Sequence, residues 1–220
     1  MPDMTLNGDL ETAEKDSLPL PRKRPKSGER REQILQTLAA MLEQPGAERV
    51  TTAGLANRLE VSEAALYRHF ASKAQMFEGL IDFIESAVFS LLRQISEAGN
   101  DGAGDADQGA HKAARIVGVL LQFAEKNPGM ARVMVGDALV FENERLHQRM
   151  SLFFDKIESE LRQILRASAA HNGAAAPTAD ANLTASLLTS FLVGRMQRFT
   201  RSGFKKSPTE QLEACIQRML

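Results

Sequence analysis

Apolar residues recur along this chain at spacings of three and four, the period of an amphipathic helix. No window alternates polar and apolar positions as a half-buried strand would. The first helical pattern starts near residue 27, and the Pro45-Gly46 pair stops it. Thr51 or Thr52 is a good N-cap for a short second helix. The chain therefore begins its folded part with helices, not strands.

A third short helix is predicted over 63–70, with Ser62 as its N-cap. The run Ser72-Lys73-Ala74-Gln75 then reads as a capping box, in which Gln75 reaches back to the Ser72 amide, and it opens a long helix reaching Ile95. Further helices are expected at about 110–126, 130–136, 141–169, 180–201 and 208–219, separated by loops rich in Gly, Asp, Asn, Ala or Pro. The pattern predicts an all-α chain of about nine helices.

Composition narrows the class of protein. Of 220 residues, 43% are hydrophobic and 25% charged, as in ordinary globular proteins. The one cysteine, Cys215, excludes a disulfide framework and a cysteine-rich zinc module, and it fits a reducing cytosol. No run of 18 apolar residues exists, so no membrane span is expected, and the acidic N-terminus is unlike a secretory signal.

Charge is distributed unevenly along the chain. Residues 1–21 carry five acids and one Lys, whereas residues 22–73 carry ten Lys and Arg against six acids. The remaining residues are close to neutral, with sixteen basic and seventeen acidic side chains. A basic segment within a protein whose net charge is −1 is a local footprint that suits a polyanion.

Residues 51–70 have the features of a helix-turn-helix. Ala56 is small where the two helices must approach closely, and the second helix is pinned by apolar residues such as Leu66 and Phe70. The outward positions of that second helix are small or polar. An ordinary three-helix packing is the alternative interpretation, and the basic arm Arg22, Lys23, Arg24 and Lys26 favours the DNA-binding one.

The run Val-Ser-Glu-Ala-Ala-Leu-Tyr-Arg-His-Phe-x-Ser-Lys at 61–73 is similar to the N-terminal domain of TetR-family regulators. That resemblance implies a three-helix DNA-binding domain, an all-helical second domain and a two-fold homodimer on double-stranded DNA with a palindromic site. We accordingly expect a disordered acidic tail and basic arm over 1–26, a helix-turn-helix domain over 27–71, and a dimerisation and partner-binding domain over 72–220.

The resemblance also implies roles for single residues. It places Tyr67, His69 and Lys73 on DNA phosphates. Thr51 and Thr52 are structural caps that can also offer helix N-terminal amides to a phosphate. Contacts to bases are expected from small or polar positions of the second helix, where the alanines can touch only thymine methyl groups. These candidates are Ser62, Glu63, Ala64, Ala65 and Arg68.

A narrower resemblance extends beyond the first domain, to the nucleoid occlusion factors of the same family. It is carried by residues 30–36, 76–85, 125–129, 138–142, 157–166 and 198–205. It implies a DNA-bound dimer in the cytoplasm, associated with the nucleoid, that antagonises the division protein FtsZ. A groove lined by Phe83, Lys126 and Asn127 would take the FtsZ C-terminal tail, with Phe83 as apolar wall and Lys126 facing acidic residues. The alternative makes Phe83 a core residue and Asn127 a helix stop.

Small residues form a stripe on the helix expected at 180–201. Ser186, Ser190 and Gly194 recur every four residues, which permits another helix to approach closely. Together with the apolar face of 141–169, this stripe predicts a four-helix dimer interface. A seam within one chain is the alternative.

Two departures from the family pattern stand out. Glu60 lies in the helix-turn-helix turn, where the family usually has Gly, and a left-handed backbone there would cost roughly 1 kcal/mol. The tail at 1–21 has no counterpart in the family pattern.

No catalytic constellation, metal-ligand spacing or cofactor motif occurs in the sequence, so neither an enzyme nor a cofactor is expected. A ligand-responsive TetR-type repressor is the alternative function.

Overall fold

The computed structural model describes residues 27–44, 50–97, 108–171 and 175–220. These residues contain helices and no strand, in agreement with the predicted all-α class. The elements are α1 (Ser27–Leu42), α2 (Thr52–Arg58), α3 (Glu63–Tyr67), α4 (Lys73–Glu97), α5 (Gln108–Lys126), α6 (Pro128–Met134), the 3₁₀ turn η2 (Asp137–Leu139), α7 (Glu144–His171), α8 (Pro177–Arg201) and α9 (Leu212–Ile216). The basic arm and the tail lie outside the described residues.

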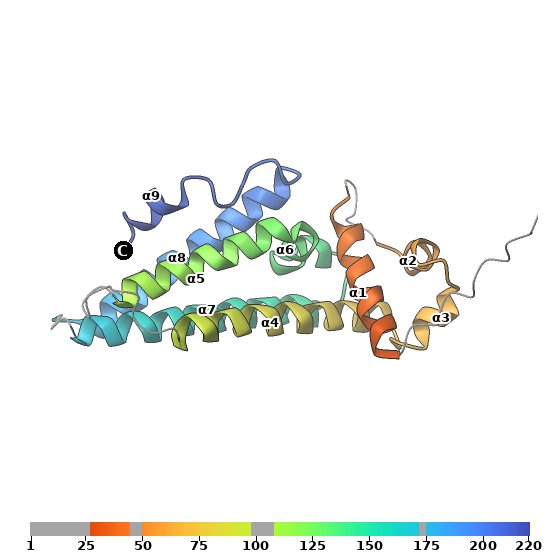
Figure 1. Ribbon diagram of the computed structural model, residues 1–220, viewed down its shortest axis with the longest axis horizontal. Helices are drawn as coiled ribbons and strands as arrows, with labels where there is room; N and C mark the ends of the chain where they lie inside the picture. Colours follow the sequence, from red (N-terminus) through yellow and green to blue (C-terminus); the bar gives the residue numbers. More distant parts are fainter. Residues whose placement is uncertain (1–26, 45–49, 98–107, 172–174) are drawn as a thin grey trace, which may run out of the picture.

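The molecule is elongated, with α1, α2 and α3 gathered at one end (Figure 1). Helices α4 and α7 run side by side along its length, and α5 and α8 lie across them. Helix α7 packs most extensively against α8. The small end therefore presents α3 outward, and the long helices form a body behind it.

One continuous apolar core joins the two ends of the molecule. It runs from Ile34 on α1, through Phe77 and Leu80 on α4, to Leu188 on α8, all essentially buried. Helix α4 belongs to both parts, because its Gly79 lies against Phe70 at the end of the helix-turn-helix. Helix α4 therefore packs against the helix-turn-helix at its start and against the long helices further along.

Helix α6 docks directly on α1 at Gly129. A Cβ built on Gly129 would lie 2.0 Å from the carbonyl oxygen of Ala39, so only glycine allows this approach. The preceding Asn127 ends α5, and Pro128 takes the first position of α6, where a missing amide costs nothing. This contact fixes the second domain against the first.

The structure shortens two predicted helices. Helix α3 ends at Tyr67 and not at 70, and the guanidinium of Arg31 donates to the His69 carbonyl (2.9 Å), which pairs one of the carbonyls that follow the helix. The C-terminal helix spans only Leu212–Ile216 and not 208–219: Gln211 before it has a left-handed backbone (φ 50°), and Ser207 and Thr209 both donate to the Glu125 carboxylate. A residue far away in the sequence hydrogen-bonds next to each shortened end.

Three further boundaries differ from the predictions. Helix α7 begins at Glu144 and not at 141. The side chain of Asn143, just before the helix, accepts a hydrogen bond from the Arg145 amide (2.9 Å). Helices α6 and α8 each begin earlier than expected, at a proline in the first turn. The predicted capping box is half correct: the Gln75 amide donates to Ser72 Oγ (3.2 Å), but the Gln75 side chain accepts from Ala71 (2.8 Å), one residue earlier.

Candidate nucleic-acid interface and partner surface

Both helices of the helix-turn-helix start at side-chain caps that the sequence predicted. Thr51 has extended backbone and its Oγ1 accepts from the Gly54 amide (3.1 Å). Ser62 does the same for α3, where its Oγ accepts from Ala65 (3.3 Å). These bonds satisfy amides that the helix itself cannot pair, and they fix where α2 and α3 begin.

The turn between the two helices carries the strain that the sequence suggested. Glu60 has φ 54°, a left-handed conformation that glycine adopts without cost. The Leu59 and Val61 amides both donate to the Ala56 carbonyl, at 3.2 and 3.0 Å, which closes the turn around Glu60. The resulting geometry holds α3 at a fixed angle to α2.

A hydrogen bond between side chains ties the starts of α2 and α3 together. Thr52 Oγ1 donates to Glu63 Oε2 at 2.7 Å. Both residues were predicted to contact DNA, and this bond gives each of them a structural role as well. The sequence held no signal for it, since the eleven-residue separation matches no helical repeat.

The outer face of α3 is open. Its exposed residues are Ser62, Glu63, Ala64, Tyr67 and Arg68, with Ala65 and His69 half-buried. Tyr67 is 45% exposed, while Leu66 behind it is fully buried. The side chains predicted to read DNA therefore lie on one accessible surface. Arg31, which the sequence reasoning missed, stabilises that surface from α1 by stacking 4.1 Å from the centre of the Phe70 ring.

Lys73 opens α4 immediately behind this surface. Its ammonium forms a salt bridge with the carboxylate of Glu142, which follows η2 in the second domain. The predicted phosphate ligand is thus held by a carboxylate of the same chain in this structure.

Phe83 lies on the surface of α4 and does not belong to the core. Its side chain is 47% exposed, so the interpretation of Phe83 as a core residue is wrong. Next to it, Arg149 of α7 donates to Asp82 (2.5 Å) and Glu85 (2.7 Å). Partial burial lowers the pKa of Arg149, but the hydrogen bonds and charges of Asp82 and Glu85 outweigh this and raise it above the ordinary value.

Lys126 is exposed at the last position of α5. Asn127 donates its side-chain amide to the Phe123 carbonyl (2.8 Å) and so terminates the helix, as the structural interpretation expected. Two cavities found among the described residues are lined by other side chains than Phe83 and Lys126. A groove spanning these two residues accordingly stays a prediction.

The predicted dimer stripe is accessible. Ser186 and Ser190 are exposed, and nothing lies within 4 Å of a Cβ built on Gly194. Large apolar side chains stand beside the stripe: Leu183 is 65% and Leu187 is 50% exposed. Leu152 on the neighbouring α7 is 57% exposed. An accessible face of this composition is typical of a surface that another protein covers.

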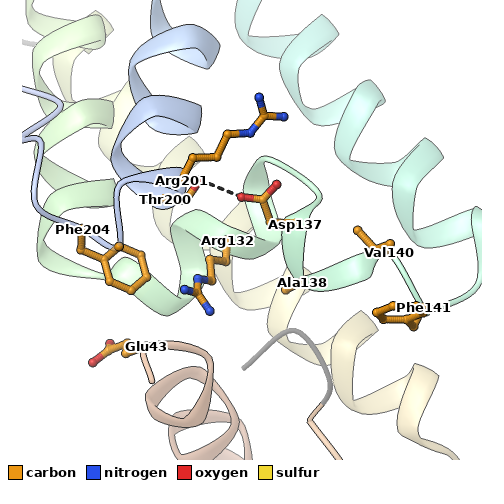
Figure 2. Close-up of a pocket in the computed structure, with 10 residues that line it drawn as sticks. Glu43, Arg132, Asp137, Ala138, Val140, Phe141, Thr200, Arg201 and Phe204 are labelled. Atoms are coloured by element: carbon orange, nitrogen blue, oxygen red, sulfur yellow. Dashed lines mark hydrogen bonds between the residues drawn. The ribbon is translucent and has the colours of Figure 1, made fainter. Parts of the chain in front are cut away.

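A cavity of about 520 Å³ lies where the two domains meet (Figure 2). Its walls come from the end of α1, from α6 and η2, and from the end of α8, together with the exposed pair Val140 and Phe141. On one side Asp137 accepts a hydrogen bond from Thr200 (2.8 Å), and on another Arg132 stacks on Phe204 with its guanidinium carbon 4.9 Å from the ring centre.

Within the described residues no group of three potential metal ligands occurs. A search of the same residues for a membrane-spanning helix found none of sufficient length and hydrophobicity.

Family models match both parts of the chain. Residues 34–80 match the bacterial regulatory proteins of the tetR family, and residues 108–220 match a tetracyclin repressor-like, C-terminal domain of the SlmA-like type. The nucleoid occlusion factor SlmA of Vibrio vulnificus strain YJ016 is 49% identical over 189 residues, which are 86% of this chain and 92% of that protein. The chain belongs to the SlmA branch of the TetR family.

A second SlmA protein matches the chain to a similar extent. The SlmA protein of Vibrio cholerae is 47% identical, with 84% of this chain and 90% of that protein covered. Among solved structures, the fatty acid degradation regulator FadR of Bacillus halodurans superposes with a TM-score of 0.70 at 15% identity, over 90% of this chain and 96% of FadR. That likeness shows a shared overall fold, and the tetR family model over residues 34–80 identifies the TetR-like helix-turn-helix end.

Proposed function

We propose that this chain is a nucleoid occlusion factor, a binding protein and not an enzyme. Bound as a homodimer to chromosomal sites in the cytoplasm, it antagonises FtsZ assembly and so blocks septum formation over the nucleoid. The observation that carries this proposal is identity of nearly one half to proteins named nucleoid occlusion factor, continued over 84–86% of the chain. TetR-family repressors with other roles diverge in the second domain.

On the DNA side, one α3 per protomer enters the major groove of a palindromic duplex. In a two-fold dimer the two half-site centres are about one helical turn, roughly 34–36 Å, apart. Tyr67, His69 and Lys73 contact the phosphate backbone together with the basic arm, and Ala64 and Ala65 of α3 can offer only apolar contacts to bases. Recognition then depends on positioning by phosphates as much as on base contacts.

On the partner side, Phe83 supplies an apolar anchor and Lys126 a positive charge for the FtsZ tail. The 47% exposure of Phe83 supports this assignment, since an aromatic anchor must be accessible to its partner. Helices α7 and α8 pair with their copies from the second protomer through Ser186, Ser190 and Gly194.

FtsZ sedimentation tests the proposal. FtsZ polymers are pelleted with the protein alone, with the protein and a duplex that it selects from a random pool, and with the duplex alone. We expect the protein with its duplex to reduce the pelleted FtsZ most strongly. The Tyr67→Ala variant, whose DNA contact is weakened, should need more duplex for the same effect.

The same experiment distinguishes nucleoid occlusion from the alternative function. A ligand-responsive TetR-type repressor would leave FtsZ in the pellet under every condition and would release DNA when a small ligand is added. Unchanged pelleting by the duplex-bound wild-type protein would therefore reject the nucleoid occlusion function.

A further inference from the structure

The salt bridge between Lys73 and Glu142 joins the start of α4, next to the helix-turn-helix, to the turn after η2 across 69 residues of sequence. The Glu142 side chain is only 9% exposed, whereas that of Lys73 is 30% exposed and stays accessible to a second anion. Lys73 also lies over the Phe77 ring, with its ammonium 5.7 Å from the ring centre, so α4 holds it in place. A largely buried carboxylate thus occupies a lysine at the edge of the helix-turn-helix surface.

Carboxylate and phosphate are oxyanions that compete for the same ammonium group. Our proposed function assigns Lys73 to a DNA phosphate, and the inference rests on that assignment. A phosphate next to Lys73 would also repel Glu142, because two negative charges would then share one lysine. DNA binding and the salt bridge therefore oppose each other.

Glu142 cannot remain where it is once its partner is lost. A buried carboxylate without a counter-charge is strongly unfavourable, so the side chain must turn toward solvent. Its backbone is part of a tight turn, in which the Glu142 amide donates to the Leu139 carbonyl (2.8 Å). The same turn carries Val140 and Phe141, 63% and 65% exposed, which line the cavity between the domains.

We propose that Glu142 mimics a phosphate in the DNA-free protein. The DNA backbone displaces it from Lys73, and the released turn at 140–142 then changes the wall of the domain-junction cavity in Figure 2. In this way DNA binding at the helix-turn-helix would change the structure of the second domain.

Substitution of Glu142 by Gln tests the competition. Glu142→Gln removes the competing charge and keeps the shape, so it should raise affinity for the selected duplex by about three- to tenfold in fluorescence anisotropy. Glu144→Gln, which removes an equally negative, exposed side chain two residues further on, controls for the change in net charge. In a Lys73→Gln background the advantage of Glu142→Gln over Glu144→Gln should vanish.

A fluorescent reporter tests the movement of the turn. The chain contains no Trp, so Phe141→Trp creates a single emission signal at the cavity wall. We expect DNA to shift this emission, and Glu142→Gln to produce a similar shift without DNA. With Lys73→Gln added, saturating duplex should cause no shift, which excludes a direct effect of DNA on the fluorophore.

The outcomes are separable. Equal affinities of Glu142→Gln and Glu144→Gln, or an emission that DNA leaves unchanged, would overturn the inference while leaving DNA binding intact. No binding of the duplex pool by the wild-type protein would overturn the proposed function, and the inference with it.

Discussion

At the residue scale, exposure and hydrogen bonds show which side chains a partner could reach and which already have a structural role. Phe83 and Asn127 were candidates for the same partner site, yet Phe83 is half-exposed and Asn127 is used to end a helix. Thr51 and Thr52 also differ in role: Thr51 caps α2, and Thr52 donates a hydrogen bond to Glu63. The same residue type therefore serves different purposes according to its neighbours.

Replacing Phe83 tests the partner site directly. Phe83→Ala should weaken binding of an FtsZ tail peptide to the DNA-bound protein by about 2 kcal/mol or more, because it removes an aromatic anchor that the bound peptide would cover. Lys126→Glu should weaken it by reversing a charge. Both variants should fold and bind DNA normally, since both side chains are exposed. Anisotropy of a labelled tail measures the binding.

Phe141→Ala is the matched control for Phe83→Ala, because it removes another exposed phenylalanine, 65% accessible, from a different surface. It should bind the FtsZ tail as the wild-type protein does. Equal binding by wild type, Phe83→Ala and Lys126→Glu would show that the tail lies elsewhere.

Glu60 offers a test of backbone strain. Because its φ is 54°, Glu60→Gly should be more stable than Glu60→Ala by about 1 kcal/mol, as both substitutions remove the side-chain interactions but only glycine relieves the backbone. Urea unfolding of the two variants gives the difference. Equal midpoints would mean that the turn relaxes without cost.

At the scale of elements, the junction between α1 and α6 depends on one glycine. Gly129→Ala places a Cβ 2.0 Å from the Ala39 carbonyl oxygen, so α6 must move away from α1. We expect a loss of about 1–3 kcal/mol in the free energy of unfolding, the usual cost of overpacking, measured in urea.

Gly118→Ala is the control for that substitution. A Cβ at Gly118 on α5 would meet only Leu212, at an ordinary 3.8 Å, so the added methyl group should be tolerated or stabilise the helix by up to about 1 kcal/mol. If Gly129→Ala were as stable as Gly118→Ala, the close approach of α6 to α1 would be incorrect.

At the scale of the whole molecule, the proposed dimer depends on close approach at α8. Gly194→Leu fills space that is open in one protomer, and in the dimer it should collide with the partner helix and weaken association by about 2 kcal/mol. Sedimentation velocity measures the dimer fraction. Arg93→Leu adds the same side chain at an exposed position of α4 and should leave the dimer unchanged. Unaltered association of Gly194→Leu would place the interface on another face.

The sequence by itself determined the all-α class, the caps at three helix starts and the family, but not every helix end. Hydrophobic spacing and the caps at Thr51, Ser62 and Ser72 depend on residues three or four positions away, so they can be read locally. The similarity of 61–73 to TetR regulators was equally local, and the tetR family model that matches residues 34–80 bears it out.

Only the tertiary structure decided which distant side chains meet. Arg31 with His69, Glu125 with Thr209, and Lys73 with Glu142 are separated by 38, 84 and 69 residues. No repeat in the sequence predicts such pairs, because packing of α1, α5 and η2 against other helices brings them together. They lie at the ends of α3 and α9, and one of them holds Lys73, the predicted phosphate ligand, on a carboxylate.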